Sequence, residues 1–164
     1  KDAPTSAAII RDHIPGIDLA SLEQALNAAF RRGVDQGLQL KPGVSELLSQ
    51  LDRPAVVVTS SSREGALRKL ALAGLADAFA DVVSLDDVTA AKPAPDPYLL
   101  AAERLGVAPD RCLAFEDSEV GAEAAHRAGC RVVQVPDILP TDGRFAHHVA
   151  PTLLAGARMA GLSV

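Results

Sequence analysis

Two adjacent carboxylates, Glu116 and Asp117, stand where a predicted buried strand meets the start of a predicted helix. Carboxylate oxygens are hard ligands, and Mg²⁺ commonly takes one or two of them from a protein together with water. The pair also fits a simpler role, because acidic side chains at a helix start interact favourably with the helix dipole. The doublet therefore predicts either a magnesium site or an acidic helix start.

Lys92 is a candidate counter-charge for an anionic ligand. It is followed by Pro93 and Pro95, which restrict the backbone and could hold the ammonium group at a fixed point. An ammonium held in this way can offset the charge of a phosphoryl group. The alternative is a solvated lysine, which is the commoner environment of this residue type.

Residues with hydroxyl groups follow the first predicted strand in an unbroken run from Thr59 to Ser62. Ser60 could hold an anionic oxygen together with backbone N–H groups at the start of the next helix. An N-cap serine is the alternative, although the run offers more donors than one cap requires. Arg63 could extend the anion site or face water. Thr59, Ser60, Ser61, Arg63 and Lys92 are therefore the candidates for binding an anionic group such as phosphate.

The elements that must position these residues alternate along the chain. Apolar and β-branched runs predict strands at 55–58, 81–84, 112–115 and 131–135, with a weak fifth at 147–149. Helical spacing of apolar residues predicts helices at 21–30, 44–51, 63–74, 96–105 and 118–128. We expect Ser21 to open the first helix in a capping box, Ser61 or Ser62 to cap the third, and Asp96 to cap the fourth.

Strands that alternate with helices indicate an α/β fold, with a doubly wound, Rossmann-like parallel sheet and helices on both faces. The run at 56–58 has the composition of a strand buried on both faces. Ligands of such sheets bind beyond the carboxyl ends of the strands. The hydroxyl run, Lys92 and the acidic doublet all follow predicted strands, so they should converge on one edge of the sheet.

The composition excludes several classes of function. With 164 residues, of which 48% are hydrophobic and 23% charged, the chain is expected to be globular, with about one domain. A net charge of −5, scattered basic residues and few aromatic side chains argue against nucleic acid as a partner. No run approaches the ~20 apolar residues of a membrane span. Two cysteines, Cys112 and Cys130, favour a reducing cytoplasm over a disulfide framework or a thiolate zinc site.

Three segments together resemble the haloacid dehalogenase superfamily of phosphohydrolases, in the branch of β-phosphoglucomutase and phosphoglycolate phosphatase. Residues 56–63, residues 91–96, and residues 115–118 with Gly121 are similar to its second, third and fourth motifs. The resemblance covers about residues 41–137. Residues 41–44 also resemble the junction at which this branch returns from a helical cap to its core. We therefore expect residues 1–40 to be a remnant of the cap and residues 41–164 to be the Rossmann-like core.

The family's first motif, Asp-x-Asp-Gly at the end of the central strand, is absent, because no two aspartates stand two residues apart. The family's strand order would place the missing strand next to both the run at 56–58 and the run at 113–115. Its loss would expose apolar surface on both neighbours, at a cost of ~25 cal/mol per Å². We therefore expect the chain to be the C-terminal portion of a longer protein, and to be inactive alone.

The resemblance implies a Mg²⁺-dependent phosphatase of a small phosphorylated metabolite, in particular a sugar phosphate, that works through an aspartyl-phosphate. It implies that Asp117 and Glu116 bind Mg²⁺. Ser60 would hydrogen-bond a phosphoryl oxygen, and Lys92 would offset the charge of the nucleophile and the phosphoryl group. The alternatives are a phosphomutase and a non-catalytic module that binds an anion or a partner; a dehalogenase fits less well, since those enzymes need no metal. We expect a monomer or homodimer with neither nucleic acid nor membrane as a partner.

Overall fold

A computed structural model describes residue 8, residues 10–35 and residues 37–164. The chain divides into two compact units, residues 1–38 and residues 39–164. The first contains helix α2 (Leu19–Asp35). This helix begins two residues before the predicted start at Ser21, because the Asp18 carboxylate accepts hydrogen bonds from the backbone N–H of Ala20 (3.1 Å) and from the Ser21 hydroxyl (2.6 Å). The assignment of this unit to a cap stays a prediction.

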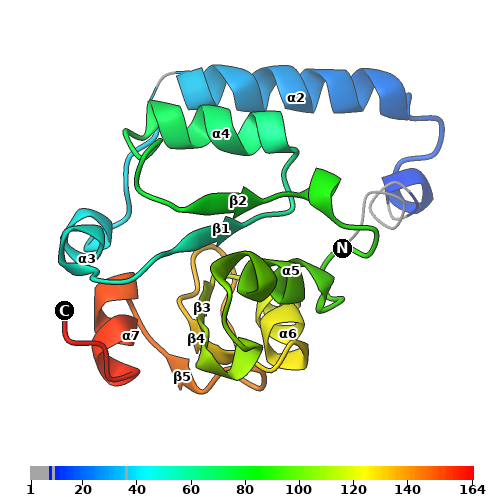
Figure 1. Ribbon diagram of the computed structural model, residues 1–164. Helices are drawn as coiled ribbons and strands as arrows, with labels where there is room; N and C mark the ends of the chain where they lie inside the picture. Colours follow the sequence, from blue (N-terminus) through cyan, green and yellow to red (C-terminus); the bar gives the residue numbers. More distant parts are fainter. Residues whose placement is uncertain (1–7, 9, 36) are drawn as a thin grey trace. The chain divides into compact units, whose positions relative to one another are not determined.

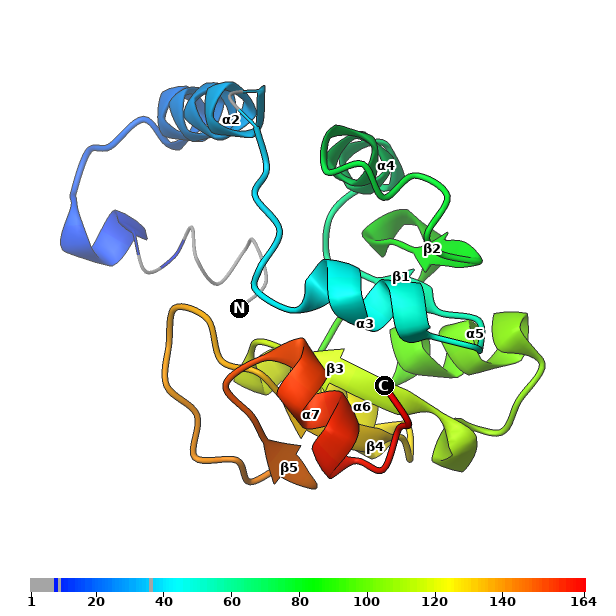
Figure 2. The same ribbon diagram turned by 90° about the vertical axis from the view of Figure 1, so that its left-hand side faces the viewer.

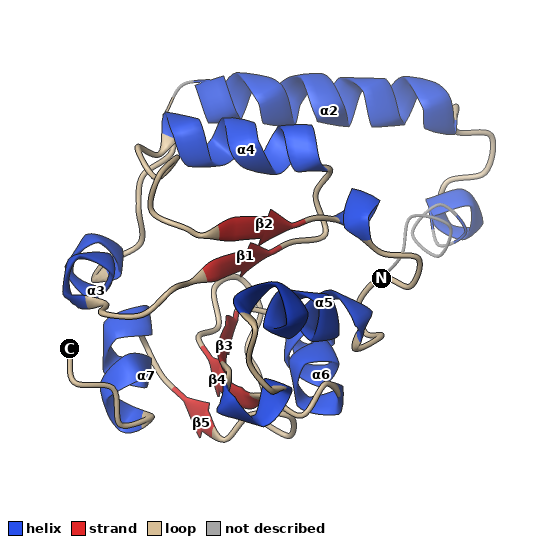
Figure 3. Ribbon diagram, in the orientation of Figure 1, coloured by secondary structure: helices blue, strands red, loops and turns tan. Residues whose placement is uncertain are grey.

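The second unit is built from parallel strands and the helices that connect them, as Figure 1 and Figure 3 show. Its strands are β1 (Val56–Val58), β2 (Asp81–Val83), β3 (Leu113–Glu116), β4 (Arg131–Gln134) and β5 (His148–Val149). Its helices are α3 (Val44–Gln50), α4 (Arg63–Leu72), α5 (Asp96–Leu105), α6 (Glu119–Arg127) and α7 (Leu153–Met159), with short 3₁₀ helices η1 (Leu85–Asp87) and η2 (Pro109–Arg111). The predicted α/β class is confirmed.

In the second unit, the starts of the predicted helices follow the sequence with one exception. Ser62 caps α4 by accepting a hydrogen bond from Gly65 N, and Ser118 caps α6 in the same way. The prediction that Asp96 is an N-cap is wrong, because the carbonyl of Pro95 already accepts from the N–H groups of Tyr98 and Leu99 (both 3.0 Å). Asp96 is therefore the first residue of α5. Helix α7 is not among the predicted elements.

Helices cover both faces of the larger sheet, whose strand order is β3-β4-β5. Ala114 and Val132 share one face and pack in a buried cluster with residues of α5 and α6. Side chains alternate along a strand, so Val133 points to the opposite face. There Gly156 of α7 approaches it so closely that an added Cβ would lie 2.5 Å from Val133 Cγ1. Figure 2 shows α7 beside α3, and these two helices form the helical layer on this face.

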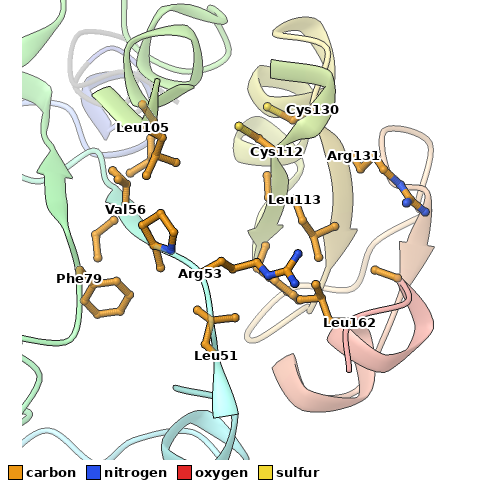
Figure 4. A pocket seen from close by; sticks show the side chains of 18 of the residues that line it. Leu51, Arg53, Val56, Phe79, Leu105, Cys112, Leu113, Cys130, Arg131 and Leu162 are labelled. Carbon is orange, nitrogen blue, oxygen red and sulfur yellow. The ribbon is translucent and has the colours of Figure 1, made fainter. Parts of the chain in front are cut away.

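A cleft of about 790 Å³ separates the two sheets, β1-β2 and β3-β4-β5. Its walls include Val56–Val58 of β1 and Leu113–Phe115 of β3, with Leu51 and Leu105 from neighbouring segments (Figure 4). The prediction that β1 is buried on both faces is therefore wrong: its three residues are only half-buried because they line this cleft. Among the described residues, β1 pairs only with β2, and β3 pairs only with β4. One edge of each strand thus faces the cleft without a strand partner.

The outer edge of β2 is covered by two arginines. Arg63 Nη1 and Arg104 Nη1 both donate to the carbonyl of Val82, at 2.8 and 3.1 Å. The same guanidinium groups pair with Asp81 and Asp87. Charged groups on an edge strand prevent another strand from pairing there. Among the described residues, no helix has the length and apolar content needed to cross a membrane.

Candidate functional site

The ammonium of Lys92 joins the carboxyl ends of β1 and β3. Lys92 Nζ donates to the carbonyl of Val58, the last residue of β1, at 3.1 Å and to Glu116 Oε1, at the end of β3, at 2.5 Å. The Lys92 and Glu116 side chains are only 10% and 7% exposed. These two residues lie 24 positions apart in the sequence, and the parallel strands bring them together at one edge. The structure thus makes Lys92 a buried, paired cation and not a solvated one.

Tyr98 is a third member of this cluster, and it is not among the site residues predicted from the sequence. Its hydroxyl donates a hydrogen bond to Glu116 Oε1, the oxygen that also accepts from Lys92. Burial raises the pKa of Tyr98 above its usual value, and the Glu116 carboxylate raises it further. The phenol therefore stays protonated and acts as a donor. Tyr98 is the only tyrosine of the chain and lies in the first turn of α5, close after Lys92, which is a signal that could have indicated it.

The second oxygen of Glu116 lies against Gly121 of α6. A Cβ added to Gly121 would stand 1.9 Å from Oε2, far inside van der Waals contact. The Glu116 side chain therefore occupies the space that any larger residue at position 121 would need. Among the described residues, none donates a hydrogen bond to Oε2, so this oxygen keeps its lone pairs for another ligand.

Asp117 follows Glu116 directly and is exposed. The described residues contain no group of three or more His, Cys, Asp and Glu side chains arranged to hold a metal ion. The donor set here is instead two adjacent carboxylates, of which Glu116 has one oxygen free. This set fits Mg²⁺, which keeps several waters and takes one or two carboxylates from the protein.

The hydroxyl run follows β1 at the same edge, but only one of its side chains is free. Thr59 Oγ1 accepts from the backbone N–H of Ser61, and Ser61 Oγ accepts from Lys69 Nζ at 2.9 Å. Ser62 caps α4. Ser60 is exposed, and its hydroxyl makes no hydrogen bond with any residue in the described part of the chain. Ser60 is therefore the hydroxyl of this run that can bind a ligand without breaking an internal contact.

Arg63 has partners other than a phosphate group. Its guanidinium contacts Asp81 (3.4 Å) and Asp87 (3.5 Å), and its backbone N–H donates to the carboxylate of Asp86 at 2.8 Å. A carboxylate of the protein itself thus lies at the amino end of α4, the place at which the sequence predicts an anionic ligand. Phosphate binding by Arg63 stays a prediction, and these contacts give the side chain a structural role at the edge of β2.

A buried lysine thus lies beside an acidic doublet at the carboxyl edge of parallel strands. A comparison of the sequence with protein families agrees with this arrangement. A family model for haloacid dehalogenase-like hydrolases matches residues 8–129, well over half of the chain. The chain belongs to the haloacid dehalogenase-like hydrolase family. The resemblance inferred from the three motifs is thereby confirmed.

Several relatives of this haloacid dehalogenase-like chain are phosphatases. Fructose-1-phosphate phosphatase YqaB of Escherichia coli is 46% identical over 83 residues, which cover 51% of this chain and 44% of the relative. The phosphorylated carbohydrates phosphatase of Thermotoga maritima is 34% identical over 114 residues, which cover 68% of this chain and 53% of the relative. The chain spans about half the length of the curated relatives it matches first.

Solved structures support the same fold. CbbY from Rhodobacter sphaeroides, determined in complex with phosphate, superposes with a TM-score of 0.77 and 26% sequence identity, covering 96% of this chain and 76% of that chain. The haloacid dehalogenase phosphatase from Thermococcus onnurineus superposes with a TM-score of 0.68 and 31% identity, covering 75% of this chain and 59% of that chain. The family and these phosphatase relatives support a hydrolase.

Proposed function

We propose that this chain forms most of the active site of a Mg²⁺-dependent phosphatase that acts on a small phosphorylated metabolite, in particular a sugar phosphate. The observation that carries the proposal is the buried Lys92–Glu116 pair, because it places a cation and the acidic doublet together at the carboxyl edge of the strands. The names of two relatives, a fructose-1-phosphate phosphatase and a phosphorylated carbohydrates phosphatase, support a sugar phosphate as the substrate class.

Each functional residue has a separate task in this proposal. Glu116 and Asp117 would hold Mg²⁺, which when bound would neutralise charge on the phosphoryl oxygens. The hydroxyl of Ser60 donates a hydrogen bond to a phosphoryl oxygen. Lys92 faces the same oxygens with a positive charge that is already positioned, so little reorganisation is needed during the reaction. Positioning and charge stabilisation supply most of the catalysis in phosphoryl transfer.

We infer that an extended segment bound in the cleft between β1 and β3 would carry the nucleophile. The cleft has apolar walls from both strands, and both present an unpaired edge to it. An extended segment could pair with both edges, and its carboxyl end would lie near Lys92, which spans this gap through Val58 and Glu116. An aspartate at that end would attack the phosphorus atom while the bond from phosphorus to the ester oxygen breaks, and the second carboxyl group of an Asp-x-Asp motif would protonate the leaving oxygen to give the alcohol. Water would then hydrolyse the aspartyl-phosphate.

The test uses the chain together with a synthetic peptide that has five apolar β-branched residues followed by Asp-x-Asp-Gly. Release of phosphate from p-nitrophenyl phosphate and fructose 1-phosphate is measured with Mg²⁺ and with EDTA. We expect no release from the chain alone, Mg²⁺-dependent release with the peptide, and none with a peptide whose first aspartate is asparagine.

Two variants of the chain make the test specific for the site. Lys92→Ala should reduce release by ~10²-fold or more, because a positioned charge is removed. Lys41→Ala is the matched control, since Lys41 pairs with Asp137 on the surface, where the two side chains are 68% and 41% exposed. If the peptide binds but no phosphate is released, or if both variants are equally active, the proposed function is wrong.

A further inference from the structure

Tyr98 contacts both members of the buried ion pair. Its hydroxyl donates to Glu116 Oε1, and the face of its ring lies 5.0 Å from Lys92 Nζ, measured to the ring centroid. An ammonium at this distance is attracted by the negative face of an aromatic ring. A single side chain thus holds the anion through its hydroxyl and the cation through its ring.

The position of Tyr98 is itself fixed by packing. The residue is 7% exposed and belongs to the buried cluster that includes Ala114 of β3 and Ala122 and Ala125 of α6. The three alanines are small, which leaves room for the ring between α5 and the sheet. Since the ring cannot move freely, its hydroxyl is a donor at a defined point.

Two donors on one oxygen determine how the Glu116 carboxylate is oriented. Lys92 and Tyr98 both donate to Oε1, so Oε2 is the oxygen that remains for a metal ion or its water. Gly121 provides the space in which Oε2 lies. The phenol adds no charge, so it orients the carboxylate without neutralising it. Hydrogen-bond partners that orient a metal-binding carboxylate in this way commonly contribute 10- to 100-fold to metal affinity.

We propose that Tyr98 is a positioning residue that orients Glu116 for Mg²⁺ and holds Lys92 beside it. The metal part of this inference rests on the proposed function, whereas the orientation of the carboxylate does not. A phenylalanine at position 98 would keep the ring and the contact with Lys92 but would leave Oε1 with one donor. Tyr98→Phe therefore tests the role of the hydroxyl group alone.

The experiment compares Tyr98→Phe with Thr141→Val in the full chain. Thr141 is a matched control because its hydroxyl lies in hydrogen-bond contact with a different carboxylate, that of Glu119, and with the side-chain oxygen of Gln134 at 2.8 Å. NMR of the metal-free protein follows the side-chain carboxyl ¹³C resonance of Glu116 and the exchange of the Lys92 ammonium protons with water. Titration with MgCl₂ on the same samples gives the metal affinity.

We expect Tyr98→Phe to shift the Glu116 carboxyl resonance, to speed exchange of the Lys92 ammonium protons and to weaken Mg²⁺ binding by ~10-fold. Thr141→Val should leave all three close to the wild-type values. The inference is overturned if Tyr98→Phe leaves the two metal-free readouts unchanged, or if Thr141→Val changes them equally, which would indicate general loosening. If no variant binds Mg²⁺, the metal role in the proposed function fails, while the metal-free spectra still decide the role of Tyr98.

Discussion

Replacing Lys92 by methionine tests whether the Lys92–Glu116 pair is as buried as its geometry indicates. Methionine has a similar length and keeps the apolar contacts of the lysine stem, so the main change is loss of the ammonium group. Glu116 would then be a carboxylate with a 7% exposed side chain and no cation beside it. Removing one partner of a buried ion pair costs about 3–5 kcal/mol, because a charge is left in a poorly solvated place.

The hydrogen bond from Tyr98 to Glu116 narrows the range expected for the loss of unfolding free energy. Tyr98 still donates to Oε1 after the substitution, so we expect the lower end of the range, about 3 kcal/mol. The exposed Lys41–Asp137 pair gives the comparison. Its side chains are 68% and 41% exposed, and a surface pair contributes only about 0–1 kcal/mol. Lys41→Met should therefore cost at least 2 kcal/mol less than Lys92→Met, by subtraction of these ranges.

Urea unfolding followed by far-UV circular dichroism measures both free energies. A double variant, Lys92→Met with Glu116→Gln, separates the burial of charge from the loss of contacts. The glutamine oxygen can still accept from Tyr98, and no unpaired charge remains, so much of the lost stability should return. Equal losses for Lys92→Met and Lys41→Met, or no recovery in the double variant, would refute the interpretation of a buried and coupled pair.

Two further predictions concern other contacts in the same unit. Gly121→Ala should weaken Mg²⁺ binding by at least ~10-fold and lower the unfolding free energy by about 1–3 kcal/mol, because the new Cβ would overlap Glu116 Oε2. Calorimetric titration measures the metal affinity, and urea unfolding measures the stability. Gly33→Ala is the control, since nothing lies within 4 Å of a Cβ added there. The hydroxyl of Ser84 and the ion pair with an arginine lower the pKa of Asp87 below its usual 3.8, so its carboxylate stabilises the fold above about pH 3.8, and this contribution is lost as the pH falls further. Unfolding free energies of wild type and Asp87→Asn should therefore converge on acidification from pH 5.5 to pH 3, and a constant gap would contradict this reasoning.

Local patterns were sufficient to predict most of the secondary structure. The strand runs and helix caps depend on neighbouring residues, as Ser62 and Ser118 show by capping α4 and α6 through contacts only three residues away. Capping also explains the errors. At α2, Asp18 accepts hydrogen bonds from the backbone N–H groups of Ala20 and Ser21, so the helix begins before Ser21. At α5, the carbonyl of Pro95 already accepts the first hydrogen bonds of the helix. Choosing between candidates one or two residues apart requires the actual backbone geometry.

The partners of long polar side chains were harder to predict. The predicted parallel sheet was enough to expect Lys92 and Glu116 at one edge, since the carboxyl ends of parallel strands lie together. The predicted sheet did not indicate the partners of Arg63, which are Asp81 in β2 and Asp87 in the segment after it. A guanidinium can reach several residues, and its rotamer decides which carboxylate it meets.

The sequence by itself determined the alternation of strands and helices, the family and the edge at which the polar residues gather, because these depend on spacing along the chain. Only the tertiary structure decided that Tyr98 donates to Glu116, that Gly121 provides space for its second oxygen, and that a cleft separates β1 from β3. These features depend on how a helix is rotated against a sheet and on how closely two elements approach. Spacing along a chain does not specify either quantity.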